Sequence, residues 1–189
     1  MIILGITGTL GAGKGTIVDY LVAEKGFSHY SVRAWLLQKV RTAGLPENRD
    51  SLFNVANELR AQYGPSDVTD QLYEIAVASG KDCVIESIRT PGEIDSLRKK
   101  GNFYLLAIDA DPKIRFERIV LRQSETDKIS YQTFLENEAR EMTTTDPAKQ
   151  NLRRCIEMTD FTIRNDGSRK ELTDQLEKIL PLIQKKDRS

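Results

Sequence analysis

The stretch GTLGAGKGT at residues 8–16 decides the fold of this chain. It follows the β-branched run Ile2–Thr7 and leads into a helical pattern that begins at residue 14. Glycines let a backbone wrap closely around phosphate oxygens and point its N–H groups inward, and the amino end of the following helix attracts negative charge. Lys14 supplies a mobile cation for the β and γ oxygens of a polyphosphate. The stretch therefore predicts a phosphate-binding loop.

The loop also indicates which of its residues contact a nucleoside triphosphate. The common pattern places Ser or Thr directly after the lysine, whereas Gly15 intervenes here and Thr16 follows. We expect the Thr16 hydroxyl to reach a Mg²⁺ ion that the phosphates hold. The loop residues predicted to bind ATP are Gly8, Gly11, Ala12, Gly13, Lys14, Gly15 and Thr16.

Short apolar runs alternate with helical patterns along the rest of the chain. The expected strands are Ile2–Thr7, Phe27–Tyr30, Cys83–Glu86, Tyr104–Asp109 and Phe161–Arg164. The expected helices span residues 14–25, 33–43, 51–63, 67–79, 91–100, 112–122, 130–142, 147–157 and 168–185. This alternation predicts an α/β fold with a parallel sheet that helices cover on both faces. No repeat or linker divides the sequence, so we expect one domain over residues 1–189.

The composition argues against several classes of protein. Of the 189 residues, 39% are hydrophobic and 30% are charged, and 28 Lys and Arg residues balance 28 Asp and Glu residues. A net charge of zero gives no overall basic field for nucleic acid or an anionic membrane, and no run approaches the ~20 apolar residues of a membrane span. Cys83 and Cys155 lie far apart and predict reduced thiols in a cytoplasmic protein. His29 is the single histidine, which argues against a histidine-based metal site or triad.

The segment CVIESIRTP at residues 83–91 is the second informative motif. A hydrophobic strand ends here in Glu86, and Arg89 follows three residues later. Ligands of α/β proteins bind at the carboxyl ends of the strands. A carboxylate there can hold the hydration shell of Mg²⁺, and a guanidinium group can clamp a second phosphate through two parallel hydrogen bonds. The motif therefore predicts Glu86 as a magnesium and substrate residue and Arg89 as a ligand of the substrate phosphate.

Asp109 is a competing candidate for the magnesium site. It ends the apolar strand Leu105–Ile108 and so matches the pattern of a Walker B aspartate. We prefer a structural role for Asp109, but the sequence leaves both Asp109 and Glu86 as candidates for Mg²⁺.

The GxGKGT form of the loop and the segment ESIRT resemble the P-loop nucleoside monophosphate kinases, a family that includes adenylate kinase and is related to dephospho-CoA kinase. Adenylate-type kinases carry DGFPRT at the second motif, so Glu86 replaces the usual Asp and Ile88 stands where Pro is usual. The resemblance implies a three-layer α/β/α fold with a five-stranded parallel sheet of order 2-3-1-4-5. It also implies a helical region for the acceptor substrate at about residues 32–80 and a short lid at about residues 118–142.

The resemblance extends to a helix and a turn that would contact ATP. Arg118 and Arg122 match the arginines at the entry to the family's lid, which stack on the adenine or reach the transferring phosphoryl group. The turn Asn165-Asp-Gly167 is similar to turns that lie beside the adenine in related kinases, which implies that Asn165 and Gly167 bind ATP. A plain turn followed by a helix cap explains these two residues equally well.

Three further arginines are candidates for the acceptor site. Arg33 follows the second strand, where the family carries an arginine that touches the acceptor, although the spacing here is shorter. Arg60 lies within the helical acceptor region, and Arg140 lies on the helix that returns from the lid. For Arg33 and Arg60 the alternative is a solvated salt bridge, and for Arg140 it is a solvated basic helix face.

These residues and the resemblance together predict an adenylate kinase-like enzyme that transfers the γ-phosphate of ATP, with Mg²⁺, to a small phosphorylated acceptor. A (deoxy)nucleoside monophosphate is the first candidate for this acceptor. The expected catalytic residues are Lys14, Arg89, Arg118 and Arg122, because cations neutralise the charge that spreads over the transferring group. The alternatives are a regulatory P-loop protein that senses nucleotides with little turnover and a dephospho-CoA kinase-like enzyme. We expect no nucleic-acid or membrane partner, and the sequence does not indicate an oligomeric state.

Overall fold

The computed structural model describes residues 1–122, 129–146 and 149–187 and places the strands in one parallel sheet. The strand order is β2-β3-β1-β4-β5, which confirms the order expected from the resemblance. Each strand begins at, or next to, the residue expected from the sequence. The strands are β1 (Ile3–Gly8), β2 (Ser28–Ser31), β3 (Cys83–Glu86), β4 (Phe103–Asp109) and β5 (Phe161–Arg164).

The helices also follow the expected pattern, with one clear difference. They are α1 (Lys14–Lys25), α2 (Val32–Thr42), α3 (Arg49–Tyr63), α4 (Asp67–Ser79), α5 (Pro91–Lys100), α6 (Pro112–Arg122), α7 (Tyr131–Met142), α8 (Leu152–Glu157) and α9 (Arg169–Asp187). The helix expected over residues 147–157 begins only at Leu152, because Asn151 caps it by accepting a hydrogen bond from the Arg154 backbone N–H. Residues 147–148 of that expectation lie outside the described residues.

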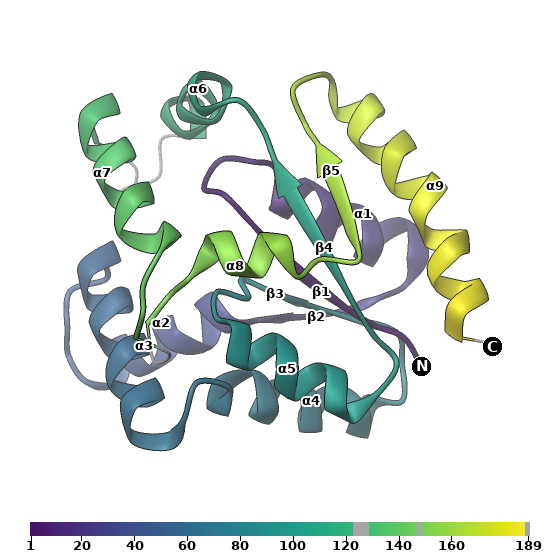
Figure 1. Cartoon of the computed structure of the whole chain (residues 1–189), viewed down its shortest axis with the longest axis horizontal. Coiled ribbons are helices and arrows are strands. Elements are labelled where there is room, and N and C mark those ends of the chain that lie inside the picture. The colour runs from purple at the N-terminus through teal and green to yellow at the C-terminus, as the bar shows by residue number, and fades with distance from the viewer. Residues whose placement is uncertain (123–128, 147–148, 188–189) are drawn as a thin grey trace.

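Two hydrophobic clusters lie on opposite faces of the sheet. Successive strand residues point to opposite faces, so Ile3 and Leu105 belong to one cluster and Leu4 and Leu106 to the other. Helices α2, α3, α4, α5 and α8 cover the first face, and α1 and α9 cover the second (Figure 1). The fold is therefore the expected three-layer α/β/α arrangement.

The strand register brings the informative sequence motifs to one edge of the sheet. Glu86, at the end of β3, lies opposite Ile6 of β1 and Ser31 of β2. On the other side of β1, Gly8 lies opposite Ile108 of β4. The phosphate-binding loop, the ESIRT segment and the start of α6 therefore leave the sheet side by side, at the carboxyl ends of the strands.

Aromatic packing joins α6 to α7 beside this edge. The Phe116 ring on α6 lies 5.1 Å from the ring centroid of Tyr131 and 5.7 Å from that of Phe134, both on α7. The predicted lid at about 118–142 includes the end of α6 and all of α7, while its residues 123–128 lie outside the described part of the chain. None of the helices within the described ranges combines the length and the apolar character that crossing a bilayer requires.

Candidate active site

The phosphate-binding loop has a backbone shape that requires glycine. Gly11 and Gly13 have φ angles of 79° and 97°, which L side chains rarely adopt. A Cβ atom on Gly11 would lie 2.5 Å from the Arg115 carbonyl oxygen, and one on Gly13 would lie 2.3 Å from Asn165 Nδ2. The loop is thus packed closely from behind, while its other side faces open space.

Contacts from distant parts of the chain hold the loop in this shape. Asn165 Nδ2 donates a hydrogen bond of 2.8 Å to the Ala12 carbonyl oxygen, and Arg115 Nη1 donates one of 3.3 Å to the Leu10 carbonyl oxygen. Ala12 itself is fully buried, and its N–H donates to the Thr9 carbonyl oxygen at 3.3 Å. The loop is therefore organised by the protein itself and does not depend on a ligand for its shape.

The Lys14 ammonium lies within the curve of this loop. Its Nζ donates hydrogen bonds to the carbonyl oxygens of Gly8, at 2.9 Å, and Thr9, at 2.8 Å. Burial, reinforced by the positive charge of Arg89, lowers the pKa of Lys14 to about 7. A bound polyphosphate would place negative charge beside the ammonium and raise that pKa again.

This pKa predicts that ATP binding takes up a proton at alkaline pH. In the free protein Lys14 is mostly neutral at pH 8 and mostly charged at pH 6, because its pKa is about 7. Binding of Mg·ATP should therefore take up close to one proton at pH 8 and very little at pH 6. Calorimetric titration in buffers of different ionisation enthalpy measures this uptake. The Lys14→Met variant should show none, and wild-type binding without proton uptake at pH 8 would contradict the expectation.

A cavity of about 740 Å³ opens in front of the loop, between α2, α3, the end of β3 and α6. The predicted site residues that line it are Gly11, Gly13, Lys14, Gly15, Thr16, Arg33, Arg60, Glu86, Arg89, Arg118 and Arg122. The predicted site residues that do not line it are Gly8, Ala12, Arg140, Asn165 and Gly167. The structure thus brings the two sequence motifs and the lid arginines to one space.

Glu86 enters the cavity with its carboxylate already hydrogen-bonded. Ser31 Oγ donates to Oε1, and Ser87 Oγ donates to Oε2 at 2.7 Å. Burial alone would raise the pKa of Glu86. The nearby His29, whose Nε2 lies 3.9 Å from Oε1, the hydrogen bonds from Ser31 and Ser87 and the charge of Lys14 outweigh burial and hold the pKa at about 2. Glu86 is therefore ionised at neutral pH and presents an anionic oxygen pair to the cavity.

Arg89 also lines the cavity, and it has a partner that the sequence did not reveal. Its Nη1 lies 3.1 Å from Oε2 of Glu141 on α7, and the other Glu141 oxygen lies 2.7 Å from Nη2 of Arg49 on α3. Burial opposes ionisation of Glu141, but the charges of Arg89 and Arg49 outweigh it and lower the pKa of that carboxyl. Three charged side chains from three separate elements therefore meet at this wall of the cavity.

The two acceptor-site candidates from α2 and α3 differ in their surroundings. Arg33 is exposed at the cavity mouth. Arg60 is only 6% exposed and pairs with Glu93 across 3.7 Å. The alternative of a solvated salt bridge is therefore wrong for Arg60, because its partner is a buried carboxylate that also caps α5. Both arginines stay predictions as acceptor ligands.

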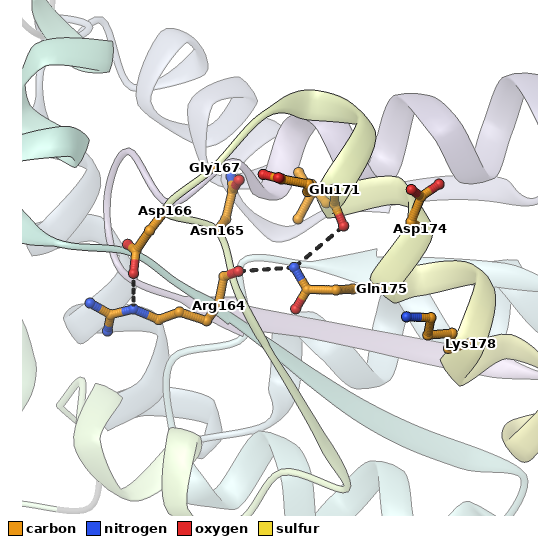
Figure 2. Close-up of a pocket in the computed structure, with 9 residues that line it drawn as sticks. Arg164, Asn165, Asp166, Gly167, Glu171, Asp174, Gln175 and Lys178 are labelled. Carbon is orange, nitrogen blue, oxygen red and sulfur yellow. Dashed lines mark hydrogen bonds and ion pairs between the residues drawn. The ribbon is translucent and has the colours of Figure 1, made fainter.

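Arg118 connects the lid helix to the turn after β5. Its Nη1 donates to the Asn165 carbonyl oxygen at 2.8 Å, and its Nη2 donates to the Gly167 carbonyl oxygen at 3.3 Å. Figure 2 shows this turn beside a second cavity of about 370 Å³, which the start of α9 also lines. Ser168 and Glu171 form a capping box at the start of α9, with backbone-to-side-chain bonds of 2.8 and 3.2 Å. The binding of ATP by Asn165 and Gly167 stays a prediction.

Arg140, a candidate ligand of the acceptor, is not among the residues that line the cavity. Its Nη1 pairs with Asp50 across 3.1 Å, and its guanidinium group stacks over the Phe53 ring at 4.6 Å. Consecutive residues of a helix point about 100° apart, so on α7 it is Glu141, one position later, that faces the cavity.

Asp109 belongs to the scaffold of the site in this structure. Thr9 Oγ1 donates to it at 2.6 Å, and Arg164 and Arg115 lie 3.5 and 3.8 Å from its oxygens. It is not among the residues that line the 740 Å³ cavity, whereas Glu86 is. The geometry favours Glu86 over Asp109 as the acid that faces a bound ligand.

Sequence reasoning missed Arg49, Glu141 and Gln150, which line the cavity, and passed over His29, which also does. One signal was present for Arg49: it is the first residue of α3, and a cation at a helix amino end opposes the helix dipole. Glu141 and Gln150 lie in an ordinary polar stretch, and only the fold brings them to the site.

The residues of the cavity fit ATP and Mg²⁺. The loop offers a closely curved glycine backbone that Arg115 and Asn165 support from behind, with Lys14 within its curve. Thr16 and Glu86 line the same cavity and could supply oxygen atoms to Mg²⁺ or to its water molecules. Magnesium that is bound through substrate phosphates typically takes only one or two ligands from the protein.

Comparisons with known proteins agree with this fold. The sequence matches the family described as "AAA domain" over residues 4–145. A UPF0200 protein of Methanococcus maripaludis is 30% identical over 187 residues, which cover 97% of this chain and 98% of that protein. The crystal structure of TT1252 from Thermus thermophilus has a TM-score of 0.60 at 21% identity and covers 95% of this chain and 96% of its own. Shikimate kinase from Bacteroides thetaiotaomicron has a TM-score of 0.55 at 13% identity, and the match covers 97% of this chain and 98% of the kinase chain.

The fold and the phosphate-binding loop define a P-loop protein, as the sequence motifs predicted, and its fold is similar to that of shikimate kinase. The chain belongs to the AAA-domain family and to the UPF0200 family.

Proposed function

We propose that this protein is an ATP-dependent phosphotransferase that moves the γ-phosphate to a small phosphorylated acceptor, with a (deoxy)nucleoside monophosphate as the preferred class. One observation carries the proposal. The phosphate-binding loop and the wall formed by Arg89, Glu141 and Arg49 line a single cavity of about 740 Å³. This cavity is large enough for two small ligands placed end to end. The similarity of the fold to that of shikimate kinase supports the same class of reaction.

The cavity has an apolar part that suits a flat ring. Helices α2 and α3 contribute Val32, Leu36, Leu52, Phe53 and Ala56 to its lining. Pockets of this kind bind rings through apolar contact and orient them with a few polar groups. A nucleobase would lie against these side chains while its phosphate reached Arg89, and this is the reason for preferring a nucleotide acceptor.

The side chains of the chain would act by position and charge. Bound ATP·Mg²⁺ supplies the phosphoryl group. Lys14 holds the oxygens of its outer phosphates, Arg89 holds the acceptor phosphate in line, and Arg118 and Arg122 neutralise charge on the transferring group. Glu86 could accept hydrogen bonds from the water molecules of a bound Mg²⁺ ion. Closure of the lid would exclude water and so limit hydrolysis of ATP.

An acceptor screen tests the proposal directly. ADP release is measured by a coupled assay with Mg·ATP and each nucleoside monophosphate, deoxynucleoside monophosphate and dephospho-CoA in turn. Acceptor-dependent ADP with a nucleoside monophosphate supports the proposed class, and ADP with dephospho-CoA alone selects the other enzyme. Tight ATP binding without turnover for any acceptor would instead indicate the regulatory alternative.

Arg89→Ala should weaken use of the acceptor more than binding of ATP. A hydrogen bond to a charged group contributes roughly 1.5–3 kcal/mol, so the acceptor KM should rise by about 10- to 100-fold. Steady-state kinetics at saturating ATP measure this, together with the ATP Kd by calorimetry. Arg154→Ala is the matched control, because the Arg154 guanidinium group pairs with Glu157 on the exposed face of α8 and does not line the cavity. An unchanged acceptor KM in Arg89→Ala would remove Arg89 from the site.

A further inference from the structure

The Glu141 carboxylate lies between two arginines of the cavity wall. Its Oε1 accepts from Arg49 at 2.7 Å and its Oε2 accepts from Arg89 at 3.1 Å. Each oxygen serves a different guanidinium group, and Glu141 is only 8% exposed. This is the arrangement in which a phosphate group bridges two arginines, with a side-chain carboxylate in place of the phosphate.

The carboxylate leaves polar atoms of the cavity wall without partners. Within the described residues, Arg49 Nε and Gln150 Oε1 are buried and have no hydrogen-bond partner. Both residues line the same cavity as Glu141. A carboxylate has two oxygens, and both are already used, whereas a phosphate brings additional oxygens that Arg49 Nε could reach. A ligand hydroxyl could likewise donate to Gln150.

Glu141 also links the lid to the acceptor region. It lies one residue after Arg140, which pairs with Asp50, and Arg49 precedes Asp50 in the chain. The end of α7 is therefore held on the first turn of α3 by two neighbouring ion pairs, one facing the cavity and one exposed. Any ligand that displaced Glu141 would loosen one of these two connections.

We propose that Glu141 is an internal substitute for the acceptor phosphate, and that the acceptor must displace it from Arg49 and Arg89 to bind. This inference rests on the proposed function and names the residue that selects the acceptor by charge. A dianionic phosphate and the Glu141 carboxylate repel each other at such close range, so they do not share the two arginines. A neutral ligand cannot compete with the carboxylate, and a phosphate can, because it makes more charge-assisted hydrogen bonds.

The test measures the affinity of inorganic phosphate by calorimetric titration. Glu141→Gln keeps the size of the side chain and removes its charge, so phosphate affinity should increase by roughly fivefold or more, the scale of coupling between two competing groups. The increase should persist in a Lys14→Met background, which weakens phosphate binding at the loop. It should disappear when Arg89→Ala is added. A residue that only positioned the arginines would give the opposite sign, so unchanged or weaker phosphate binding in Glu141→Gln overturns the proposal.

Asp50→Asn is the matched control. It breaks the exposed ion pair between the same two helices and leaves Arg49, Arg89 and Glu141 unchanged. Its phosphate affinity should stay close to that of the wild type. An increase equal to that of Glu141→Gln would mean that loosening of α7, and not removal of the competing charge, is responsible, and this too would overturn the proposal.

Hydrogen exchange on the wild-type chain tests the same displacement without a variant. Phosphate should raise amide exchange in the last turn of α7, because Glu141 leaves its partners, and equal exchange with and without saturating phosphate contradicts the proposal. The acceptor screen remains independent. If the wild type turns over an acceptor but Glu141→Gln binds phosphate no more tightly, only this inference is removed. If Glu141→Gln binds phosphate more tightly but the wild type turns over no acceptor, only the proposed function is removed.

Discussion

Replacement of Lys14 by methionine is expected to lower the rate of phosphoryl transfer by about 10²- to 10³-fold, the usual effect of removing one group that stabilises transition-state charge. The ammonium already lies within the loop, held by the carbonyl oxygens of Gly8 and Thr9, and it needs only a short movement to meet phosphate oxygens. Methionine has a similar length and no charge, so the loop can keep its shape. The measurement is kcat for acceptor-dependent ADP release.

Lys113→Met is the matched control for this experiment. Lys113 is exposed near the start of α6, and the same substitution there should leave kcat unchanged. Thermal unfolding and circular dichroism should show that both variants keep the fold. Wild-type turnover in Lys14→Met would reject the chemistry assigned to the loop.

The second large effect is expected from Gly13→Ala, which should reduce ATP affinity by more than about 100-fold. Gly13 has a φ of 97°, and a Cβ atom there would lie 2.3 Å from Asn165 Nδ2. The loop would have to move away from Asn165, so its N–H groups would no longer point at one centre. Calorimetric titration with Mg·ATP measures the loss.

Gly15→Ala separates this effect from a general loss of glycine. No atom lies within 4 Å of a Cβ built on Gly15, and its φ is not positive. The common phosphate-loop pattern also carries a side chain at the position that follows the lysine. ATP affinity in Gly15→Ala should therefore stay within a few-fold of wild type. Equal losses in the two variants would contradict the geometry described for Gly13.

Local sequence signals predicted the framework of this molecule. The strands and the phosphate-binding loop follow from patterns that span only a few residues, and the structure contains them. The sheet order came from resemblance to a family and is confirmed. Helix 147–157 was placed too early, because apolar periodicity alone did not reveal the Asn151 cap.

The residues of the candidate site were predictable only where a single short motif contains them. Glu86 ends β3, Arg89 follows it three residues later, and both line the cavity as expected. The pairing of Arg89 with Glu141 joins residues 52 positions apart, and no local pattern indicates it. The direction of Arg140 likewise depends on how α7 rotates against α3. Such long-range pairs follow from packing, which a single sequence does not reveal.

The support of the phosphate-binding loop by Asn165 has a consequence for synthesis of the chain. Asn165 contacts the Ala12 carbonyl oxygen across 153 positions, so residues made first receive this contact from residues made near the end. While β5 is still inside the ribosome, the nascent chain already contains the loop glycines. It lacks the Asn165 side chain that holds the loop in shape. The loop therefore acquires its support from Asn165 only after β5 has been made and has joined the edge of the sheet.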